Sequence, residues 1–230
     1  MRQASLSPKA HSQLILRGLV APVYMFGLLF LAAGRWDYWQ GWVYLGLNTM
    51  ILLLMGLVLT KNMALVEERL SPGHGMKGWD KVYFALSTPL YFVALVLGGL
   101  DARFGWSALP LPFYLAGVAV YLLGQAVFLW ARYTNVYFSS VVRIQADRGQ
   151  TVCRDGPYRY VRHPGYVGGI LFAASMGLVL GSAWATLPQL GASALLVWRT
   201  AREDATLLAE LPGYAEYAAG TRYRLVPGVW

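Results

Sequence analysis

The sequence predicts an all-α integral membrane protein with about six transmembrane helices, of which the last two form a short hairpin. Hydrophobic residues make up 57% of the 230 residues and charged residues only 13%, whereas soluble domains have about 25% charged residues. Several apolar windows reach the ~20 residues that a helix needs to cross a bilayer. Because 14% of the residues are aromatic, the chain also has far more apolar surface than a disordered polypeptide.

Cysteine content and net charge narrow the class further. The single cysteine, Cys153, excludes an intrachain disulfide, and the chain has no clustered Cys/His set for structural zinc. The net charge of +8 is accounted for by the basic cytoplasmic loops of a multi-spanning protein. We therefore expect neither a metal ion nor a nucleic-acid partner.

Four long apolar windows predict the first four transmembrane helices, over residues 14–33, 39–60, 82–100 and 109–130. Pro22 lies inside the first window, where a helix bundle tolerates a kink. Trp39 and Trp42 open the second window at positions typical of the membrane interface. Pro110 and Pro112 open the fourth, where a missing N–H group costs little.

The apolar region 166–198 predicts the fifth and sixth helices. It is interrupted by Gly181-Ser182-Ala183-Trp184 and by Pro188, so we expect a hairpin of two short arms. The first arm is rich in small residues, which favour close helix packing or close approach of a ligand to the backbone. These residues are Gly165, Gly168, Gly169, Ala173, Ala174 and Gly177.

The charged residues predict the topology. With six spans, the basic segments all fall on one side, and the positive-inside rule places that side, with both termini, in the cytoplasm. These segments are the N-terminus with Arg2, Lys9 and Arg17, the loop 61–81, the stretch 132–162 and the tail from Arg199. No cleavable signal peptide is expected. We divide the chain into four N-terminal helices (1–130) and a C-terminal part (131–230) that contains two polar cytoplasmic segments around the hairpin.

The first polar segment reads GPYRYVRHPGYVG from Gly156 and ends directly before the hairpin. Its Gly-Pro and His-Pro pairs set a defined loop. A helix starting at Pro164 would direct free N–H groups and a positive dipole end toward that loop, beside Arg162 and His163. This arrangement favours an anion such as a carboxylate, although a juxtamembrane basic loop with interfacial tyrosines explains the same composition.

The second polar segment continues the sixth helix into the cytoplasm. Arg199 and Glu203 are four residues apart and share one helix face. We expect Arg202 and Asp204 to be solvent-exposed and of little energetic consequence, and we assign a functional role to Glu203. The tail after Leu211 is amphipathic and is suited to lie along the membrane surface.

The two polar segments together, in this order, resemble the isoprenylcysteine carboxyl methyltransferase family, which shares its C-terminal core with the phospholipid N-methyltransferases. The motifs that carry the resemblance are GPYRYVRHPGYVG and RTAREDATLLAELPGYAEYAAGTRYRLVP. They lie between Asn135 and Pro227, whereas the first four spans match only as generic membrane helices. The resemblance implies an integral-membrane methyltransferase that uses S-adenosylmethionine, with a lipophilic or prenylated substrate that enters from the bilayer.

The resemblance also implies a set of site residues. His163 and Tyr166 fall on the family's His-Pro-x-Tyr residues, and Glu203 falls on its acidic pair. Tyr214, Tyr217 and Arg224 fall on the C-terminal Tyr/Arg pattern. This chain departs from the family in two places: the acidic pair is Glu203-Asp204 rather than two glutamates, and Leu211-Pro212-Gly213 replaces a Phe-Gly before the tyrosine.

The chemistry of S-adenosylmethionine agrees with these residues. Arg162, His163 and the helix N-terminus suit its carboxylate, and Glu203 suits its ammonium or ribose hydroxyls. The rings that can stack or face the sulfonium belong to Tyr158, Tyr160 and Tyr166. The resulting cofactor-binding set is Tyr158, Arg162, His163, Tyr166, Glu203, Tyr214 and Tyr217.

Methyl transfer needs positioning rather than a protein nucleophile. For a carboxylate or thiolate acceptor we expect Arg199 to orient the substrate; for an amine, Glu203 or His163 is a candidate base. The sequence leaves prenylated peptide, phospholipid amine and small thiol open as acceptors, and it leaves the role of residues 135–142 open. The competing classes are a sterol-reductase-like protein with a nicotinamide cofactor and a non-enzymatic transporter or assembly protein.

Overall fold

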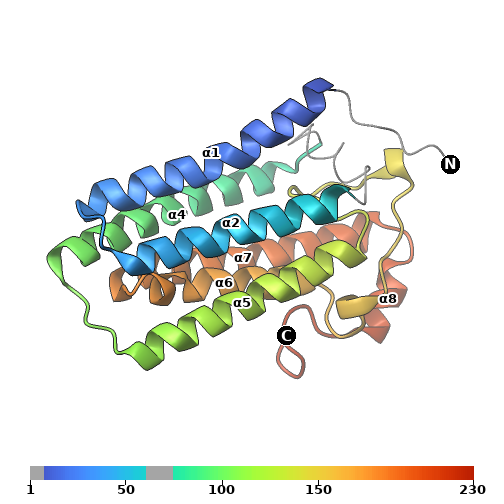
Figure 1. The fold of residues 1–230 in the computed structure, drawn as a ribbon. Coiled ribbons are helices and arrows are strands. Elements are labelled where there is room, and N and C mark those ends of the chain that lie inside the picture. Colours follow the sequence, from blue (N-terminus) through green and yellow to red (C-terminus); the bar gives the residue numbers. More distant parts are fainter. Residues whose placement is uncertain (1–7, 61–74) are drawn as a thin grey trace.

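In the computed structural model, which describes residues 8–60 and 75–230, the described residues are helical and contain no β-strand. The longer helices run side by side, and a short helix lies at one end of them (Figure 1). The α-helices are α1 (Pro8–Ala33), α2 (Trp39–Thr60), α4 (Gly78–Phe104), α5 (Leu111–Thr134), α6 (Pro164–Val179), α7 (Ala183–Glu210) and α8 (Tyr214–Gly220). Two 3₁₀ turns, η1 (Ala146–Arg148) and η2 (Gly156–Arg159), lie between α5 and α6.

The helix boundaries follow from local chemistry. Pro110 and Pro164 stand at the starts of α5 and α6, where no intrahelical N–H bond is lost. Ser182 caps α7, because its side chain accepts a hydrogen bond from the Ala185 N–H at 3.0 Å. Gly213 takes a positive φ of 79° in the turn between α7 and α8, a conformation that glycine adopts without strain.

The helical part of the sequence prediction is confirmed, including the hairpin. The break between α6 and α7 falls at Leu180–Ser182, but the break predicted at Pro188 is wrong, since Pro188 lies inside α7. The loop predicted to extend to Lys81 ends earlier, because α4 begins at Gly78. The basic residues predicted near the N-terminus and over residues 61–74 fall outside the described residues or side chains.

Membrane crossing is supported by length and composition for two helices. Among the described residues, α4 and α5 are long and apolar enough to span a bilayer, and Pro22–Ala33 and α6 form shorter apolar helices. Large apolar side chains also cover the outer surface of the bundle rather than only its interior. Examples that are more than half exposed are Val23, Leu31, Leu53, Phe113 and Leu187.

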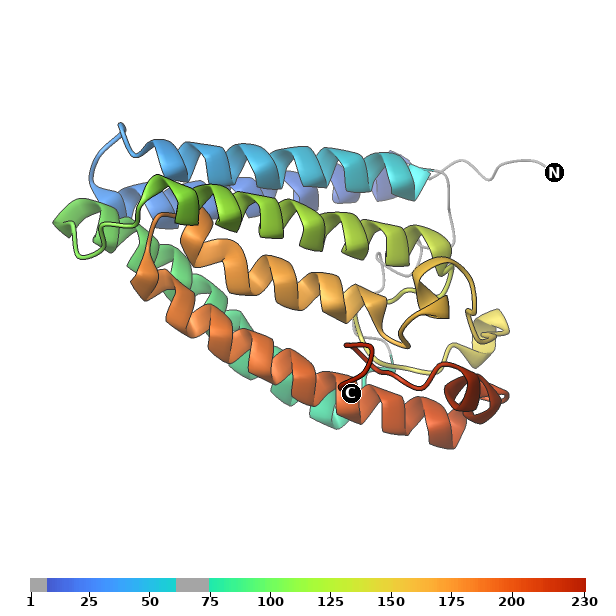
Figure 2. The same ribbon diagram turned by 90° about the horizontal axis from the view of Figure 1, so that it is seen from below.

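The interior of the bundle contains a large apolar cluster. Leu29, Leu95, Val179 and Leu180 form part of a buried cluster contributed by α1, α4, α6 and the turn after it. The short connections α1–α2, α4–α5 and α6–α7 gather at one end of the bundle (Figures 1 and 2). The long α5–α6 connection, α8 and the C-terminal tail gather at the opposite end. The two polar segments of the C-terminal part therefore lie together at that second end.

Glycines bring α5 and α6 into close contact. A Cβ atom placed on Gly168 would lie 2.5 Å from the Gly124 carbonyl oxygen and 2.6 Å from the Phe128 nitrogen. A Cβ on Gly124 would lie 2.6 Å from the Phe172 nitrogen. Because these neighbours are backbone atoms, they cannot move aside without separating the two helices. The small residues of α6 therefore fix the position of its first turn relative to α5.

The Gly168→Ala substitution is expected to destabilise the protein by about 1–3 kcal/mol, the usual cost of overpacking a well-packed site. The measurement is the unfolding midpoint in detergent. Gly46→Ala on α2 is the matched control, because a Cβ at Gly46 meets nothing within 4 Å. An equal loss of stability in both variants would contradict the packing argument.

Candidate functional site

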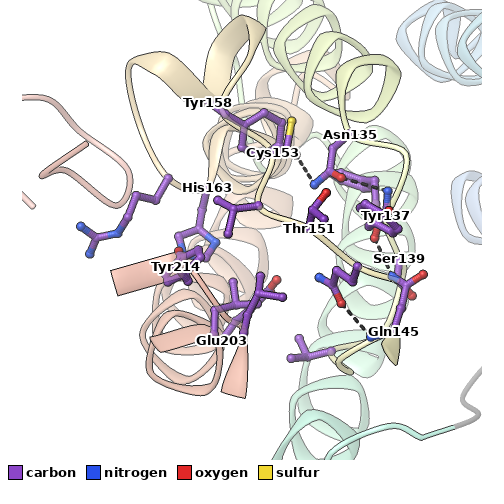
Figure 3. Close-up of a pocket in the computed structure, with 18 of the residues that line it drawn as sticks. Asn135, Tyr137, Ser139, Gln145, Thr151, Cys153, Tyr158, His163, Glu203 and Tyr214 are labelled. Atoms are coloured by element: carbon purple, nitrogen blue, oxygen red, sulfur yellow. Dashed lines mark hydrogen bonds between the residues drawn. The ribbon is translucent and has the colours of Figure 1, made fainter. Parts of the chain in front are cut away.

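A pocket of about 810 Å³, counting the part open to solvent, lies at the polar end of the bundle. The α5–α6 connection forms one wall, and the start of α6 forms the opposite wall together with α7 and α8 (Figure 3). Asn135, Tyr137, Ser139 and Gln145 lie across the pocket from His163, Glu203 and Tyr214.

The first wall, residues 135–153, is stabilised by its own hydrogen bonds. The buried Gln145 side chain donates to the Tyr137 carbonyl at 2.7 Å, and its backbone N–H donates to Gln150 Oε1 at 2.7 Å. The Tyr137 hydroxyl donates to the Gly149 carbonyl at 3.0 Å. The sequence left the role of residues 135–142 open, and the structure places most of them in this wall. Its lining residues are Asn135, Tyr137, Phe138, Ser139, Val141, Val142, Arg143, Gln145, Gln150, Thr151, Val152 and Cys153.

The second wall contains all seven residues that the sequence predicted to bind the cofactor. They are Tyr158, Arg162, His163, Tyr166, Glu203, Tyr214 and Tyr217. They come from η2, the loop before α6, the first turn of α6, α7 and α8. The C-terminal tail ties this wall together, because the N–H groups of Arg162 and His163 donate to the carbonyls of Tyr223 and Arg224 at 2.9 and 3.0 Å.

Asp204 is the centre of this second wall, contrary to the expectation that it would be exposed. Its side chain is fully buried. It accepts hydrogen bonds from Arg162 Nε and the second Arg162 amino group at 2.8 and 2.9 Å, from the Tyr214 hydroxyl at 2.9 Å and from Arg224 Nε at 2.7 Å. His163 Nε2 lies 3.1 Å from Asp204 Oδ1. The i,i+4 helix pattern missed this role because the partners come from distant segments.

The charge of Asp204 is stabilised in place. Burial alone would raise the pKa of this carboxyl group, but hydrogen bonds from His163, Arg162 and Arg224 hold the pKa well below its usual range. Burial, reinforced by the adjacent Asp204 charge, raises the pKa of the Tyr214 hydroxyl. At neutral pH, Asp204 is therefore an ionised acceptor and Tyr214 is a neutral donor.

Arg162 lines the pocket, but it is engaged with the protein itself. It makes two bonds to Asp204 and donates to the carbonyls of Thr221 and Arg222 at 3.1 and 2.8 Å. Most of the Arg162 donors are therefore taken up by the protein itself, and its predicted contact with a ligand carboxylate stays a prediction. Gly165, in the first turn of α6, also lines the pocket.

Tyr166 and Glu203 form a second pair in the same wall. The Tyr166 hydroxyl donates to Glu203 Oε2. The Tyr166 ring is stacked on His163, with centroids 5.7 Å apart and an interplanar angle of 7°. The Arg199 guanidinium lies 5.4 Å from the centroid of the same ring. Because His163 and Arg199 already contact this ring, the contribution of Tyr166 is to orient Glu203.

Two further tyrosines lie at the pocket, and one predicted tyrosine does not. Tyr217 donates to the Tyr158 carbonyl at 2.6 Å, and Asn135 donates to the Tyr158 hydroxyl at 3.4 Å, which links the two walls. Burial raises the pKa of the Tyr158 hydroxyl, so that it stays neutral. Tyr160 is two-thirds exposed and is not among the lining residues, so its predicted ligand contact is wrong.

Arg199, predicted to orient the acceptor, is not a lining residue of the pocket. It pairs with the buried carboxylate of Asp80, through Nε at 2.8 Å and a terminal nitrogen at 3.2 Å. It also donates to the Ser140 carbonyl at 2.9 Å. Within the described residues, no group of three or more His, Cys, Asp or Glu side chains is arranged to hold a metal ion.

Comparison with models of protein families places part of the chain beside a known family. The model of the isoprenylcysteine carboxyl methyltransferase family matches residues 115–209, from within α5 to near the end of α7. A search of the curated proteins finds no match. The matched segment contains both walls of the pocket except for α8 and the C-terminal tail.

The low pKa of Asp204 gives a pH-dependent prediction. In the unfolded chain this carboxyl group binds a proton near its ordinary pKa of about 3.9, whereas the folded protein keeps it ionised. The stabilisation it provides is therefore present above about pH 5 and is lost progressively as the pH falls below about 4. We expect Asp204→Asn to unfold at lower temperature than the wild type at neutral pH, with the difference narrowing under acid conditions. Thermal unfolding of both proteins across this pH range is the measurement, and a pH-independent difference would contradict it.

Proposed function

Since residues 115–209 belong to the isoprenylcysteine carboxyl methyltransferase family, we propose that this protein is an integral-membrane methyltransferase that uses S-adenosylmethionine and methylates a lipophilic acceptor. The observation that carries the proposal is the convergence on one pocket of all seven residues predicted to bind the cofactor. Three segments distant in sequence supply these residues, as a binding site requires.

The side chains that line the pocket suit the chemistry of the cofactor. It offers the Glu203 carboxylate for the ammonium or ribose hydroxyls and the first turn of α6 for the carboxylate. Tyr137 and Tyr158 offer aromatic rings from opposite walls. His163 is oriented by Asp204 and Tyr214 before any ligand binds.

The protein's part in the reaction is positioning and exclusion of water. When bound, S-adenosylmethionine supplies an electrophilic methyl group on a sulfonium for in-line transfer to the acceptor. Glu203 is oriented by Tyr166, and His163 is oriented by Asp204, so both side chains are preorganised. The wall formed by residues 135–153 lines one side of the pocket, where it would limit access of water to the bound cofactor.

The distribution of side chains supports a membrane orientation with the pocket in the cytoplasm. The pocket end carries most of the described Lys and Arg residues, whereas the opposite end carries Arg35 and Arg103, balanced by Asp37 and Asp101. The positive-inside rule places the basic end in the cytoplasm. Tryptophans lie at both ends of the helices, as expected at membrane interfaces: Trp36, Trp39, Trp106 and Trp184 at one end and Trp79, Trp130 and Trp198 at the other. Six spans with both termini in the cytoplasm accord with this orientation.

The acceptor is a separate part of the proposal. We favour a prenylated cysteine carboxylate or another lipophilic acceptor, because an ionised acceptor needs no base. Two groups that line the pocket and could orient an anionic acceptor are the His163 side chain and the first turn of α6. Phospholipid amines and small thiols are the alternatives within the same cofactor class.

The transporter alternative is weakened by the interior of the bundle. Several polar groups there bond to one another: the Tyr121 hydroxyl donates to Asn48 at 3.0 Å, and Gln125 donates to Tyr121 at 3.2 Å. Tyr44 and Tyr91 hydroxyls lie 3.2 Å apart. Such contacts are typical of helix association, whereas a transport pathway is lined by ionisable groups near the bilayer centre.

Glu203→Gln is expected to weaken binding of S-adenosylhomocysteine by about 10–100-fold, since a hydrogen bond to a charged group contributes about 1.5–3 kcal/mol. Binding is measured by calorimetry on detergent-solubilised protein. The control is Glu216→Gln on α8, because Glu216 is exposed, pairs with Arg154 at the surface and does not line the pocket; its affinity should match the wild type. NADPH should not bind, and NADPH binding without S-adenosylhomocysteine binding would favour the reductase class.

Cys153 provides a second readout of ligand occupancy. It is the only cysteine in the chain, it lines the pocket, and burial raises the pKa of its thiol. Alkylation by a maleimide at about pH 8.5 should be slowed by S-adenosylhomocysteine in the wild type and not in Glu203→Gln at the same ligand concentration. Transfer of labelled methyl groups to a farnesylated cysteine, phosphatidylethanolamine or an alkanethiol then separates the three acceptor classes.

A further inference from the structure

We infer that Asp80 is a positioning residue of the pocket, which gives the N-terminal helices a direct part in the site. That the pocket holds a cofactor rests on the proposed function. The contacts of Asp80 with both walls do not depend on which ligand the pocket binds. Asp80 lies in the first turn of α4 and is fully buried. It lies outside residues 115–209, which match the methyltransferase family.

Asp80 connects three separate parts of the protein. Its carboxylate accepts two hydrogen bonds from Arg199 on α7, at 2.8 and 3.2 Å. Its Oδ2 also accepts the backbone N–H of Val142 at 2.7 Å. Val142 is a lining residue of the pocket. The charge of Asp80 is further stabilised at the N-terminus of α4 by the helix dipole.

The neighbouring residue Lys77 strengthens the same junction. Its backbone N–H donates to the Val142 carbonyl at 3.2 Å, so both polar groups of the Val142 backbone are bound by the start of α4. The Lys77 ammonium donates to both carboxylate oxygens of Glu210 on α7, each at 2.7 Å. The wall formed by residues 135–153 is therefore anchored to α4 at one defined point.

Arg199 transmits the position of Asp80 to the opposite wall. Its guanidinium lies 4.6 and 5.0 Å from the ring centroids of Tyr83 and Phe84 on α4, and 5.4 Å from that of Tyr166 on α6. Tyr166 in turn bonds to Glu203 and stacks on His163. Asp80 thus fixes both walls: Val142 by a direct hydrogen bond, and Tyr166 through Arg199.

In this arrangement Arg199 positions Tyr166 and does not orient the acceptor directly. A guanidinium that is paired with a buried carboxylate and surrounded by three aromatic rings has little freedom to bind a second anion. Loss of the Asp80 charge would leave Arg199 buried without its counter-ion, so that Arg199 would reorient and release Tyr166. The geometry of the pocket would change although no lining side chain had been altered.

The test compares Asp80→Asn with Asp101→Asn. Asp101 is also a buried aspartate of α4, but it lies at the far end of that helix, where it accepts hydrogen bonds from Ser107 and Ser182. Both substitutions remove a buried carboxylate from α4, and unfolding midpoints measure their effect on stability. Arg199→Lys is a second variant that tests the contact between Asp80 and Arg199. It keeps the positive charge but loses the two hydrogen bonds to Asp80 and the stacking on the aromatic rings.

Two readouts are used, one of them free of ligand. We expect Asp80→Asn and Arg199→Lys to raise the Kd for S-adenosylhomocysteine about 10-fold, equivalent to about 1.4 kcal/mol, and Asp101→Asn to leave it within about 2-fold of the wild type. Among these variants, only Asp80→Asn should alkylate Cys153 about 10-fold faster in ligand-free protein, because the amide has one acceptor oxygen for which the Val142 N–H and Arg199 compete, and the wall that carries Cys153 is held less firmly. The loss of affinity caused by Tyr166→Phe should be smaller in the Asp80→Asn background.

The outcomes separate this inference from the proposed function. Wild-type protein that does not bind S-adenosylhomocysteine would refute the proposed cofactor, while the ligand-free alkylation rates would still decide whether Asp80 holds the wall. Unchanged alkylation in Asp80→Asn, or the same changes in Asp101→Asn at an equal loss of stability, would overturn the role of Asp80. Additive effects of Tyr166→Phe and Asp80→Asn would overturn the link through Arg199.

Discussion

The buried carboxylate of Asp204 is the interaction on which the candidate site depends. It joins α7 to the loop before α6 through Arg162 and His163, to α8 through Tyr214 and to the C-terminal tail through Arg224. Burying one carboxylate is costly unless its oxygens are well supplied with donors, and here four side chains meet that requirement. The same donors are thereby placed at the edge of one pocket, so a requirement of folding also organises the site.

A second buried aspartate, Asp80, performs a comparable task on the other side of the pocket. Asp204 orders the wall made by α6, α7 and α8, and Asp80 connects the opposite wall to α4 and α7. Both rely on arginine as the partner, because its planar guanidinium offers several donors in a fixed geometry. The close packing of α5 on α6 at Gly124 and Gly168 holds the first turn of α6 between these two anchors.

The helices were predicted well from the sequence, because the features that form a helix and end it lie within a few residues of one another. Apolar windows of membrane length, prolines at helix starts and glycines at turns act within a few residues. Pro188 was misjudged because a helix can accommodate a proline when neighbouring groups compensate for the lost hydrogen bond. The pocket residues were predicted from two motifs, whereas the wall of residues 135–153 has no such motif, since its shape comes from Gln145, Tyr137 and Gly149 bonding within the loop.

Composition, hydrophobic windows and motifs predicted the all-helical class, the positions of the main helices, the resemblance to the methyltransferase family and a set of residues that share one pocket. Only the tertiary structure decided what each charged residue contacts. Asp204 was expected to be exposed and is buried, Arg162 was expected to meet a ligand and binds Asp204, and Arg199 pairs with Asp80, 119 residues away. The physical reason is that burial and ion pairing depend on segments brought together by folding, and helical periodicity reports only which residues share a face.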